Sequence, residues 1–244
     1  VRLPTFGVLV VQGIFMSVAG NALSYRTLFF QIAGITDIAA SILQASGLVA
    51  CAFGAVIGGY LSDSLVRRCF PLHGRPLLAQ VAIIMGLPNC AASFLVHPPE
   101  EWAFCFYLSL SVLGGLTAWT ITAVNLPILS EIVPANSRSA IMAWQTALEG
   151  AAGAVLGNAM VSLIAEKLYG YDMSKASPGH IQNAENREAL GSSLALSSCV
   201  PLFVGFGFYT ILHCTYPRDL KRARAMAAEA NPDDQMSESK ANPD

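Results

Sequence analysis

Charged residues are scarce in this sequence, making up 12% of its 244 positions, whereas 54% are hydrophobic. Soluble globular domains carry about 25% charged residues, so the deficit favours a membrane protein over a soluble one. The net charge of −2 says little about partners, because in a membrane protein the distribution of charge matters more than the total. Nothing in the sequence suggests nucleic-acid binding.

Paired cysteines and catalytic signatures are also missing. The six cysteines occur singly, without a C-x-x-C pair, which favours neither a disulfide framework nor a zinc site. The sequence lacks a G-x-S-x-G elbow, an H-E-x-x-H helix, a Walker loop and a dinucleotide fingerprint. The four histidines lie in loops or at helix ends, so no His is placed to serve a nucleophile within a bilayer. We therefore expect no enzyme activity, no metal site and no cofactor.

Long apolar runs are what the sequence contains instead. A hydrocarbon core of about 30 Å needs about 20 apolar residues in a helix. Six stretches qualify, each bounded by charges, prolines or turn residues: 5–32, 39–61, 77–96, 102–129, 139–165 and 190–213. The pattern predicts an all-α membrane protein with six transmembrane helices, the fourth kinked or ended by Pro127. Residues 225–244 have no apolar period and are predicted to be a disordered tail.

The distribution of Lys and Arg predicts the orientation. Three basic residues fall in connections on one side of the membrane: Lys167, Lys175 and Arg187. Ten fall on the other side: Arg2, Arg67, Arg68, Arg75, Arg138, Arg218, Lys221, Arg222, Arg224 and Lys240. The positive-inside rule then predicts that both termini are cytoplasmic. The chain opens on Val1 without a signal peptide, which indicates a piece cut from a longer protein.

Small and polar residues recur at helical spacing on four of the predicted spans. The second and fifth stripes consist of small residues, which favours close helix packing: Gly47, Cys51, Gly54 and Gly58, then Thr146, Gly150, Gly153 and Gly157. The first and fourth stripes include larger polar groups: Gly13, Ser17, Gly20, Asn21 and Ser24, then Ser111, Gly115, Ala118, Thr122 and Asn125. These two stripes line a cavity or supply hydrogen bonds between helices; the pattern leaves both open.

Two ionisable residues fall inside predicted spans. Glu149 lies midway along the fifth, where an ionised carboxylate is costly unless it is paired, hydrated or protonated. It is a candidate for proton coupling or gating, with a structural hydrogen-bonded carboxylate as the alternative. Arg26 lies past the middle of the first span, and we interpret it as a side chain that snorkels to the interface rather than as an anion ligand.

Several motifs resemble one known family. The segment Gly-Gly-Tyr-Leu-Ser-Asp at 58–63, followed by arginines, resembles the loop signature of the major facilitator superfamily, and 131–138 is similar to that family's loop after the fourth or tenth helix. Further features resemble the C-terminal six helices of plant- and protist-type spinster-like members: Thr5-Phe6 to Gln12-Gly13, His73-Gly74-Arg75 with Gln80, Leu148-Glu149, Tyr169-Gly170-Tyr171 and Thr215 to Asp219. This resemblance extends to about Arg224.

The resemblance implies a role for each candidate residue. The first and fourth spans would correspond to cavity-lining helices, which makes the substrate-facing candidates Ser17, Asn21, Ser24, Tyr25, Trp119, Thr122 and Asn125. Glu149 is the coupling candidate. The candidates for a cytoplasmic gate are Asp63, Arg67, Arg75, Glu131 and Arg138. Such transporters rock two six-helix halves about a midplane site, so the chain would need an N-terminal half as partner.

The sequence thus predicts half of a transporter that moves a small solute or lipid-like molecule across a membrane by rocker-switch alternating access, with proton coupling as a further hypothesis. The partners expected are the lipid bilayer, the other half and the substrate. The alternative is a non-transporting six-helix scaffold or receptor-like subunit. Polar stripes on two separate spans suit a transporter better, whereas charged loops without a cavity would suit a scaffold.

Overall fold

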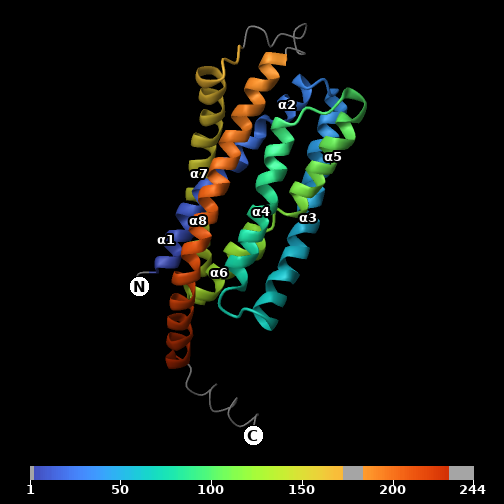
Figure 1. Ribbon diagram of the computed structural model, residues 1–244. Helices are drawn as coiled ribbons and strands as arrows, with labels where there is room; N and C mark the ends of the chain where they lie inside the picture. Colours follow the sequence, from blue (N-terminus) through green and yellow to red (C-terminus); the bar gives the residue numbers. More distant parts are fainter. Residues whose placement is uncertain (1–2, 173–183, 231–244) are drawn as a thin grey trace.

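The computed structural model describes residues 3–172 and 184–230, which form helices joined by short connections (Figure 1). The α-helices are α1 Pro4–Ala22, α2 Arg26–Ile32, α3 Asp37–Arg68, α4 Gly74–Leu95, α5 Glu100–Leu116, α6 Leu126–Ile132, α7 Arg138–Leu163 and α8 Ala184–Ala230. The described ranges contain no strand. The all-α class predicted from the sequence is confirmed.

Within the described residues, six helical segments are long and apolar enough to cross a membrane, in agreement with the predicted number. Helices α1 and α2 together make the first, α5 and α6 the fourth, and α7 continues through a π-helical turn at Ile164–Leu168. Several helices extend past the apolar runs. The predicted ends at 61 and 213 fall inside α3 and α8, because a helix continues into its polar flanks when those residues tolerate helical geometry.

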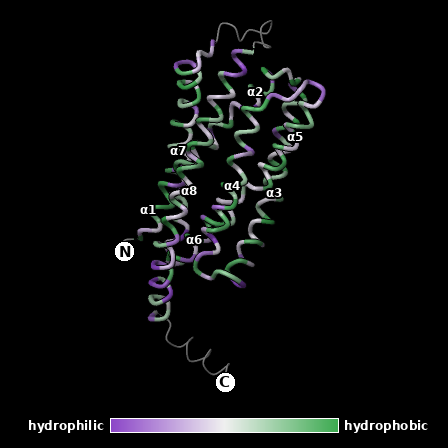
Figure 2. The backbone as a smooth tube through the Cα atoms, in the orientation of Figure 1, coloured by the Kyte–Doolittle hydropathy of each residue, from purple (hydrophilic) through white to green (hydrophobic). Residues whose placement is uncertain are grey.

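The C-terminal tail differs in part from the prediction. Residues 225–230 were expected to be disordered but continue α8. This stretch, Ala-Met-Ala-Ala-Glu-Ala, consists of strong helix formers. Figures 1 and 2 show this end of α8 extending past the other helices, with hydrophilic residues gathered there. Residues 231–244, together with Arg2 and Lys175 of the charge count, lie outside the described residues.

Glycines bring pairs of helices into close contact. Helix α1 packs mainly on α7 and α8, α3 on α5, and α4 on α8. A Cβ atom added to Gly54 of α3 would lie 2.6 Å from the carbonyl oxygen of Leu116 in α5, and one on Gly157 of α7 would lie 2.8 Å from the carbonyl oxygen of Val18 in α1. Such distances leave no room for a side chain, so part of each small-residue stripe does set helix–helix contacts. On the fifth span Gly153 and Gly157 do so, whereas Thr146 and Gly150 are exposed and nothing lies within 4 Å of a Cβ added to Gly150.

The first and fourth spans are interrupted. A 3₁₀ turn at Leu23–Tyr25 separates α1 from α2. Helix α5 ends at Leu116, Thr117 to Trp119 are not helical, and a π-helical turn at Thr120–Asn125 leads into α6. The sequence assigned the break in this span to Pro127. In the structure the span is first interrupted earlier, at 117–119, and Pro127 sits in the first turn of α6, where its missing N–H leaves no bond of that helix unmade.

The buried apolar side chains form two clusters. One surrounds Ile128, Leu129 and Tyr216, near the end of the bundle that holds the loop at residues 69–73. We call this end the basic end, because four arginines lie there: Arg67, Arg68, Arg75 and Arg218. The other surrounds Phe29, Phe30 and Tyr107 near the opposite end. Ring centroids of Phe30 and Tyr107 are 5.1 Å apart. The two clusters thus lie toward opposite ends of the bundle, and the space between them is available for a site.

The close α3–α5 contact predicts a selective effect of a single methyl group. Gly115→Ala would place its Cβ against the Gly47 carbonyl oxygen and within 2.9 Å of the Cys51 backbone nitrogen. We expect a loss of about 1–3 kcal/mol of stability from overpacking. Gly59→Ala is the matched control on α3, since nothing lies within 4 Å of its added Cβ. Thermal unfolding in detergent should show a lower midpoint for Gly115→Ala only; equal midpoints for the two variants would contradict this packing.

Candidate functional site

A cavity of about 480 Å³ lies between the two apolar clusters. Its wall is formed by α1, α3, α4, α5 and α8 together with both interrupted stretches. The first interruption contributes Leu23 and the adjoining Arg26; the second contributes Thr117, Ala118 and Thr120. The volume is in the range of small-molecule sites. Discontinuous helices at corresponding places in two halves of a repeat are the usual location of a transporter's midplane site.

The cavity wall combines one cation with amides and hydroxyls on an otherwise apolar surface. Arg26 is its charged member, and the described lining includes no acidic residue. The amides are Gln44 of α3 and Asn89 of α4. Hydroxyls come from Ser93, Ser111, Thr117, Thr120 and Ser198. Of these residues only Ser111 belonged to a sequence-predicted stripe; single polar residues inside apolar spans, such as Gln44 and Asn89, were the signal that was overlooked.

Arg26 does not snorkel. One terminal guanidinium nitrogen donates a hydrogen bond to Ser111 Oγ of α5, and the guanidinium carbon lies 5.2 Å from the centre of the Phe30 ring. Ser111 is eleven residues beyond Glu100, the start of α5, which places it about 16 Å along the helix from that end. The guanidinium is therefore held inside the bundle, about 16 Å from that end of α5, because Ser111 and Phe30 offer it contacts there.

The polar residues predicted on the first span turn away from this cavity, toward α7. The side chains of Ser17 and Asn21 pack over Gly153, and the Cβ of Asn21 faces Gly157. Ser24 Oγ donates to Asn158 Oδ1 at 3.0 Å, and the Tyr25 hydroxyl lies 3.2 Å from Ser162 Oγ. The stripe is thus used for helix packing within this half. A substrate-facing role for these four residues stays a prediction.

The polar residues predicted on the fourth span point in different directions. Trp119 is 6% exposed and packs against Gly58 of α3. Thr122 is exposed, whereas Asn125 is 2% exposed in the interior. The predicted stripe holds only if the span is one continuous α-helix. The break at 117–119 and the π-helical turn that follows change the rotation from one residue to the next, so the side chains no longer share a face. None of the three lines the cavity, so their role as substrate contacts is also a prediction only.

Asn125 belongs to a buried hydrogen-bond network instead. Its Nδ2 donates to Gln12 Oε1 at 3.0 Å, and its Oδ1 accepts from the Tyr209 hydroxyl at 2.8 Å. This network joins α1, the π-helical turn before α6, and α8. The amide nitrogen of Gln12 is buried without a partner. An unsatisfied buried donor is costly, which marks this network as more than packing.

Glu149 lies beside this network, between α1 and α7. Its Oε1 accepts a hydrogen bond of 2.6 Å from Gln145 Nε2, one turn earlier on α7. The carboxylate occupies the space that a side chain at Gly13 would fill. Glu149 forms no ion pair within the described ranges. The structure thus gives Glu149 an amide partner and no cation.

A charged cluster occupies the basic end. Arg75 Nε and one terminal nitrogen donate to Glu131 Oε1 at 3.1 and 2.6 Å, and the other terminal nitrogen donates to Ser62 Oγ at 2.9 Å. The Tyr216 hydroxyl donates to the second Glu131 oxygen. Asp63 lies 3.5 Å from Arg75 and 3.8 Å from the exposed Arg67. These contacts join α3, α4, α6 and α8 within one half of the predicted transporter.

Four of the five gate candidates therefore meet in one place. Asp63, Arg67, Arg75 and Glu131 form the cluster, whereas Arg138 begins α7 and makes none of these contacts. Arg75 is 8% exposed and satisfied inside this half, so it is not free to reach acids on another bundle. Asp63 keeps half of its side chain exposed. Tyr216 was missed as a member because the sequence offers no periodicity linking residues 131 and 216.

Comparison of the fold with solved structures gives two informative matches. A bacterial homolog of the human lysosomal transporter Spinster, in an inward-facing and occupied conformation, matches with a TM-score of 0.70 and 21% identity, over 89% of this chain and 50% of that one. This chain therefore has the fold of one half of that homolog. The inward-facing, unoccupied conformation of that homolog matches at 0.56 and 18% identity, over 89% and 48%.

The comparisons show the fold alone. The chain spans about half the length of the structures it matches. No protein-family model matches the sequence, and no curated protein matches it. Together with the six apolar spans, the fold makes this an integral multi-pass membrane protein.

The Arg75–Glu131 pair predicts strong coupling between two substitutions. Arg75→Met leaves Glu131 uncompensated in a part-buried position, and Glu131→Gln leaves Arg75 with only the longer contact of 3.5 Å to the half-exposed Asp63. Each single change should destabilise by about 3 kcal/mol, and the double variant should lose clearly less than the sum. Unfolding of the four proteins in detergent measures this cycle. Additive losses would show that the two groups do not interact.

Proposed function

We propose that this chain is one half of a secondary transporter, which moves a small solute or lipid-like molecule across a membrane by rocking against a second six-helix half. The observation that carries the proposal is a cavity of about 480 Å³ at the two interrupted spans of a half-transporter fold. Irregular backbone within a membrane is tolerated where it is buried in protein or lines a cavity. Coupled rocking of two such halves gives each side access to the cavity in turn.

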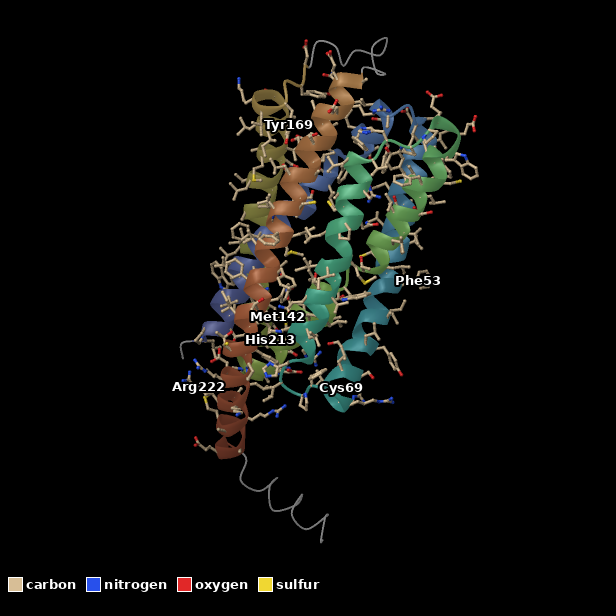
Figure 3. All side chains as sticks on the ribbon, viewed as in Figure 1. Phe53, Cys69, Met142, Tyr169, His213 and Arg222 are labelled. Carbon is tan, nitrogen blue, oxygen red and sulfur yellow. The ribbon has the colours of Figure 1, made fainter. Side chains whose placement is uncertain are left out.

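Exposed apolar side chains support a bundle that needs lipid or a second half around it. On α3, Phe53, Val56 and Tyr60 are 62%, 74% and 71% exposed. Figure 3 shows Phe53 projecting outward from α3. Large exposed apolar patches on a membrane protein are covered by lipid tails or by another protein. We propose that the N-terminal half of the transporter covers part of this surface.

The basic end would hold the cytoplasmic gate, with both termini on that side. Arg75, fixed by Glu131 and Ser62, orients Asp63 on α3. The half-exposed carboxylate of Asp63 is then available to the N-terminus of a helix in the other half, where backbone N–H groups favour an anion. Arg67 and Arg138 would add attraction to acidic groups or lipid headgroups.

Glu149 is the proposed proton-coupling group. It lies between α1 and α7, bonded to Gln145, without a cation among the described residues to hold its charge. A carboxylate in such a place binds and releases a proton readily when its surroundings change. Movement of α1 against α7 would alter those surroundings directly, since the Glu149 carboxylate packs on Gly13 of α1.

Uptake into vesicles tests the transport function. Proteoliposomes would contain this chain assembled with its partner half, and a panel of labelled neutral, anionic, cationic and lipid-like molecules would be offered from outside. We expect saturable uptake of at least one class above that of empty vesicles. A properly inserted complex that takes up none of the panel would favour a non-transporting scaffold.

The coupling role predicts matched effects of two substitutions on different helices. Glu149→Gln removes the proton site, and Gly13→Ala places a methyl group where the Glu149 carboxylate lies. Both should lower the dependence of uptake rate on an imposed pH gradient by about tenfold. Gly7→Ala, on the same helix with nothing within 4 Å of its Cβ, is the control. Unchanged gradient dependence in Glu149→Gln would refute proton coupling through this residue.

A further inference from the structure

We propose that His73 and His213 bind a divalent metal ion that prefers imidazole ligands, such as Zn²⁺, at the basic end of the bundle. His73 closes the loop at residues 69–73 and directly precedes α4, and His213 lies on α8 (Figure 3). The two residues are 140 positions apart, so the sequence patterns from which no metal site was expected could not indicate this pair. The described cavity wall contains neither residue, which makes the site independent of the proposed transport function.

The geometry of the two imidazole rings suits chelation. The Nδ1 atoms of His73 and His213 lie 3.1 Å apart, and the ring centroids lie 5.2 Å apart with an angle of 35° between the ring planes. With metal–nitrogen bonds of about 2.0–2.1 Å, this separation gives an angle of about 100° at the metal, close to the tetrahedral value of about 109°. One ion can therefore bind both nitrogens after small rotations of the rings.

A chain of hydrogen bonds on α4 and α8 fixes the tautomer of His213. The Thr210 hydroxyl donates to the carbonyl oxygen of Phe206 at 3.1 Å, so it accepts at 3.0 Å from Gln80 Nε2. Gln80 Oε1 then faces His213 Nε2 at 3.2 Å and accepts its hydrogen. The lone pair of His213 is left on Nδ1, toward His73. Histidines that bind metals usually donate their other ring N–H to a fixed acceptor in this way.

The pair is open to solution. His73 is exposed and His213 is partly exposed, so an ion reaches both Nδ1 atoms from water. His73 can carry its own hydrogen on Nε2 when its Nδ1 binds the ion. Within residues 3–172 and 184–230, no group of three His, Cys, Asp or Glu residues is placed to hold a metal. Water molecules therefore complete the coordination shell, as they do in the open sites of zinc proteins.

The site lies beside the charged cluster of the basic end. His73 is two residues before Arg75, and His213 is three residues before Tyr216. Arg75 and Tyr216 both donate hydrogen bonds to Glu131. The positive charge of Arg75 is thus compensated and does not exclude a cation nearby. A bound ion would link the start of α4 to α8 a second time and stabilise the folded half, because the unfolded chain has no preformed site.

Metal binding to the untagged chain tests the site. The whole chain, without a polyhistidine tag, would be placed in phosphatidylcholine nanodiscs and titrated calorimetrically with Zn²⁺, with empty nanodiscs as blank. We expect saturable binding of one ion and a higher midpoint of thermal unfolding in its presence. Mg²⁺, which takes oxygen ligands, should do neither. His73→Ala and His213→Ala should each weaken Zn²⁺ binding at least tenfold and abolish the rise in midpoint, because one imidazole alone forms no chelate.

Cu²⁺ reports on the ligands directly. Its electron paramagnetic resonance spectrum, when bound to the chain, should show two nitrogen ligands, and either histidine variant should leave one. Gln80→Leu should weaken Zn²⁺ binding about tenfold, because His213 loses the acceptor that fixes its tautomer. Two matched controls should bind Zn²⁺ as the unaltered chain does: His97→Ala, exposed beyond the far end of α4, and Cys214→Ser, directly after His213.

None of these measurements depends on transport. The metal-free unfolding midpoint of His73→Ala should stay close to that of the unaltered chain, since the ring is exposed, so that lost binding is not lost folding. Three results would overturn the proposal. They are a chain that binds no Zn²⁺ saturably, an affinity that both histidine variants leave unchanged, and a loss of binding in Cys214→Ser, which would assign the ion to a thiol.

Discussion

Glycine-mediated contact between helices is the constraint on which the rest of this structure depends. Helix α1 is held against α7 through Gly153 and Gly157, and α3 against α5 through Gly54 and Gly115. Because α1 packs mainly on α7 and α8 rather than on α3 or α5, the space between the two pairs stays open in the middle of the bundle. The cavity lies in that space, at the height where the spans of α1–α2 and α5–α6 are interrupted.

The charged residues at the basic end and those in the middle of the bundle differ in whether an opposite charge compensates them. At the basic end, Arg75 and Glu131 compensate each other and tie four helices together, so charge there is satisfied within the half. In the middle, Arg26 and Glu149 each lack an opposite charge among the described residues. Satisfied charges stabilise, whereas isolated ones cost free energy and indicate a site that an ion, a proton or a solute completes.

The sequence predicted the fold well, because apolar length and small-residue stripes are local properties that a helix preserves. The directions in which the candidate site residues point could not be predicted in the same way. The stripe through Ser111 and Asn125 does not stay on one face, because the non-helical residues 117–119 and the π-helical turn change the register of the helix. A regular spacing of residues in the sequence gives no sign of such a break. Arg26 was interpreted as snorkelling since depth alone does not reveal that Ser111, on another span, holds its guanidinium inward.

Access of the cavity to each side of the membrane is the most direct test of this account. Cys51 lines the cavity, and the other five cysteines are replaced by serine, so that one thiol reports on it. In the assembled two-half transporter, a membrane-impermeant maleimide should label Cys51 from either side, and added solute should raise the rate from one side while lowering it from the other. Labelling from one side only, at a rate that no solute changes, would contradict the account.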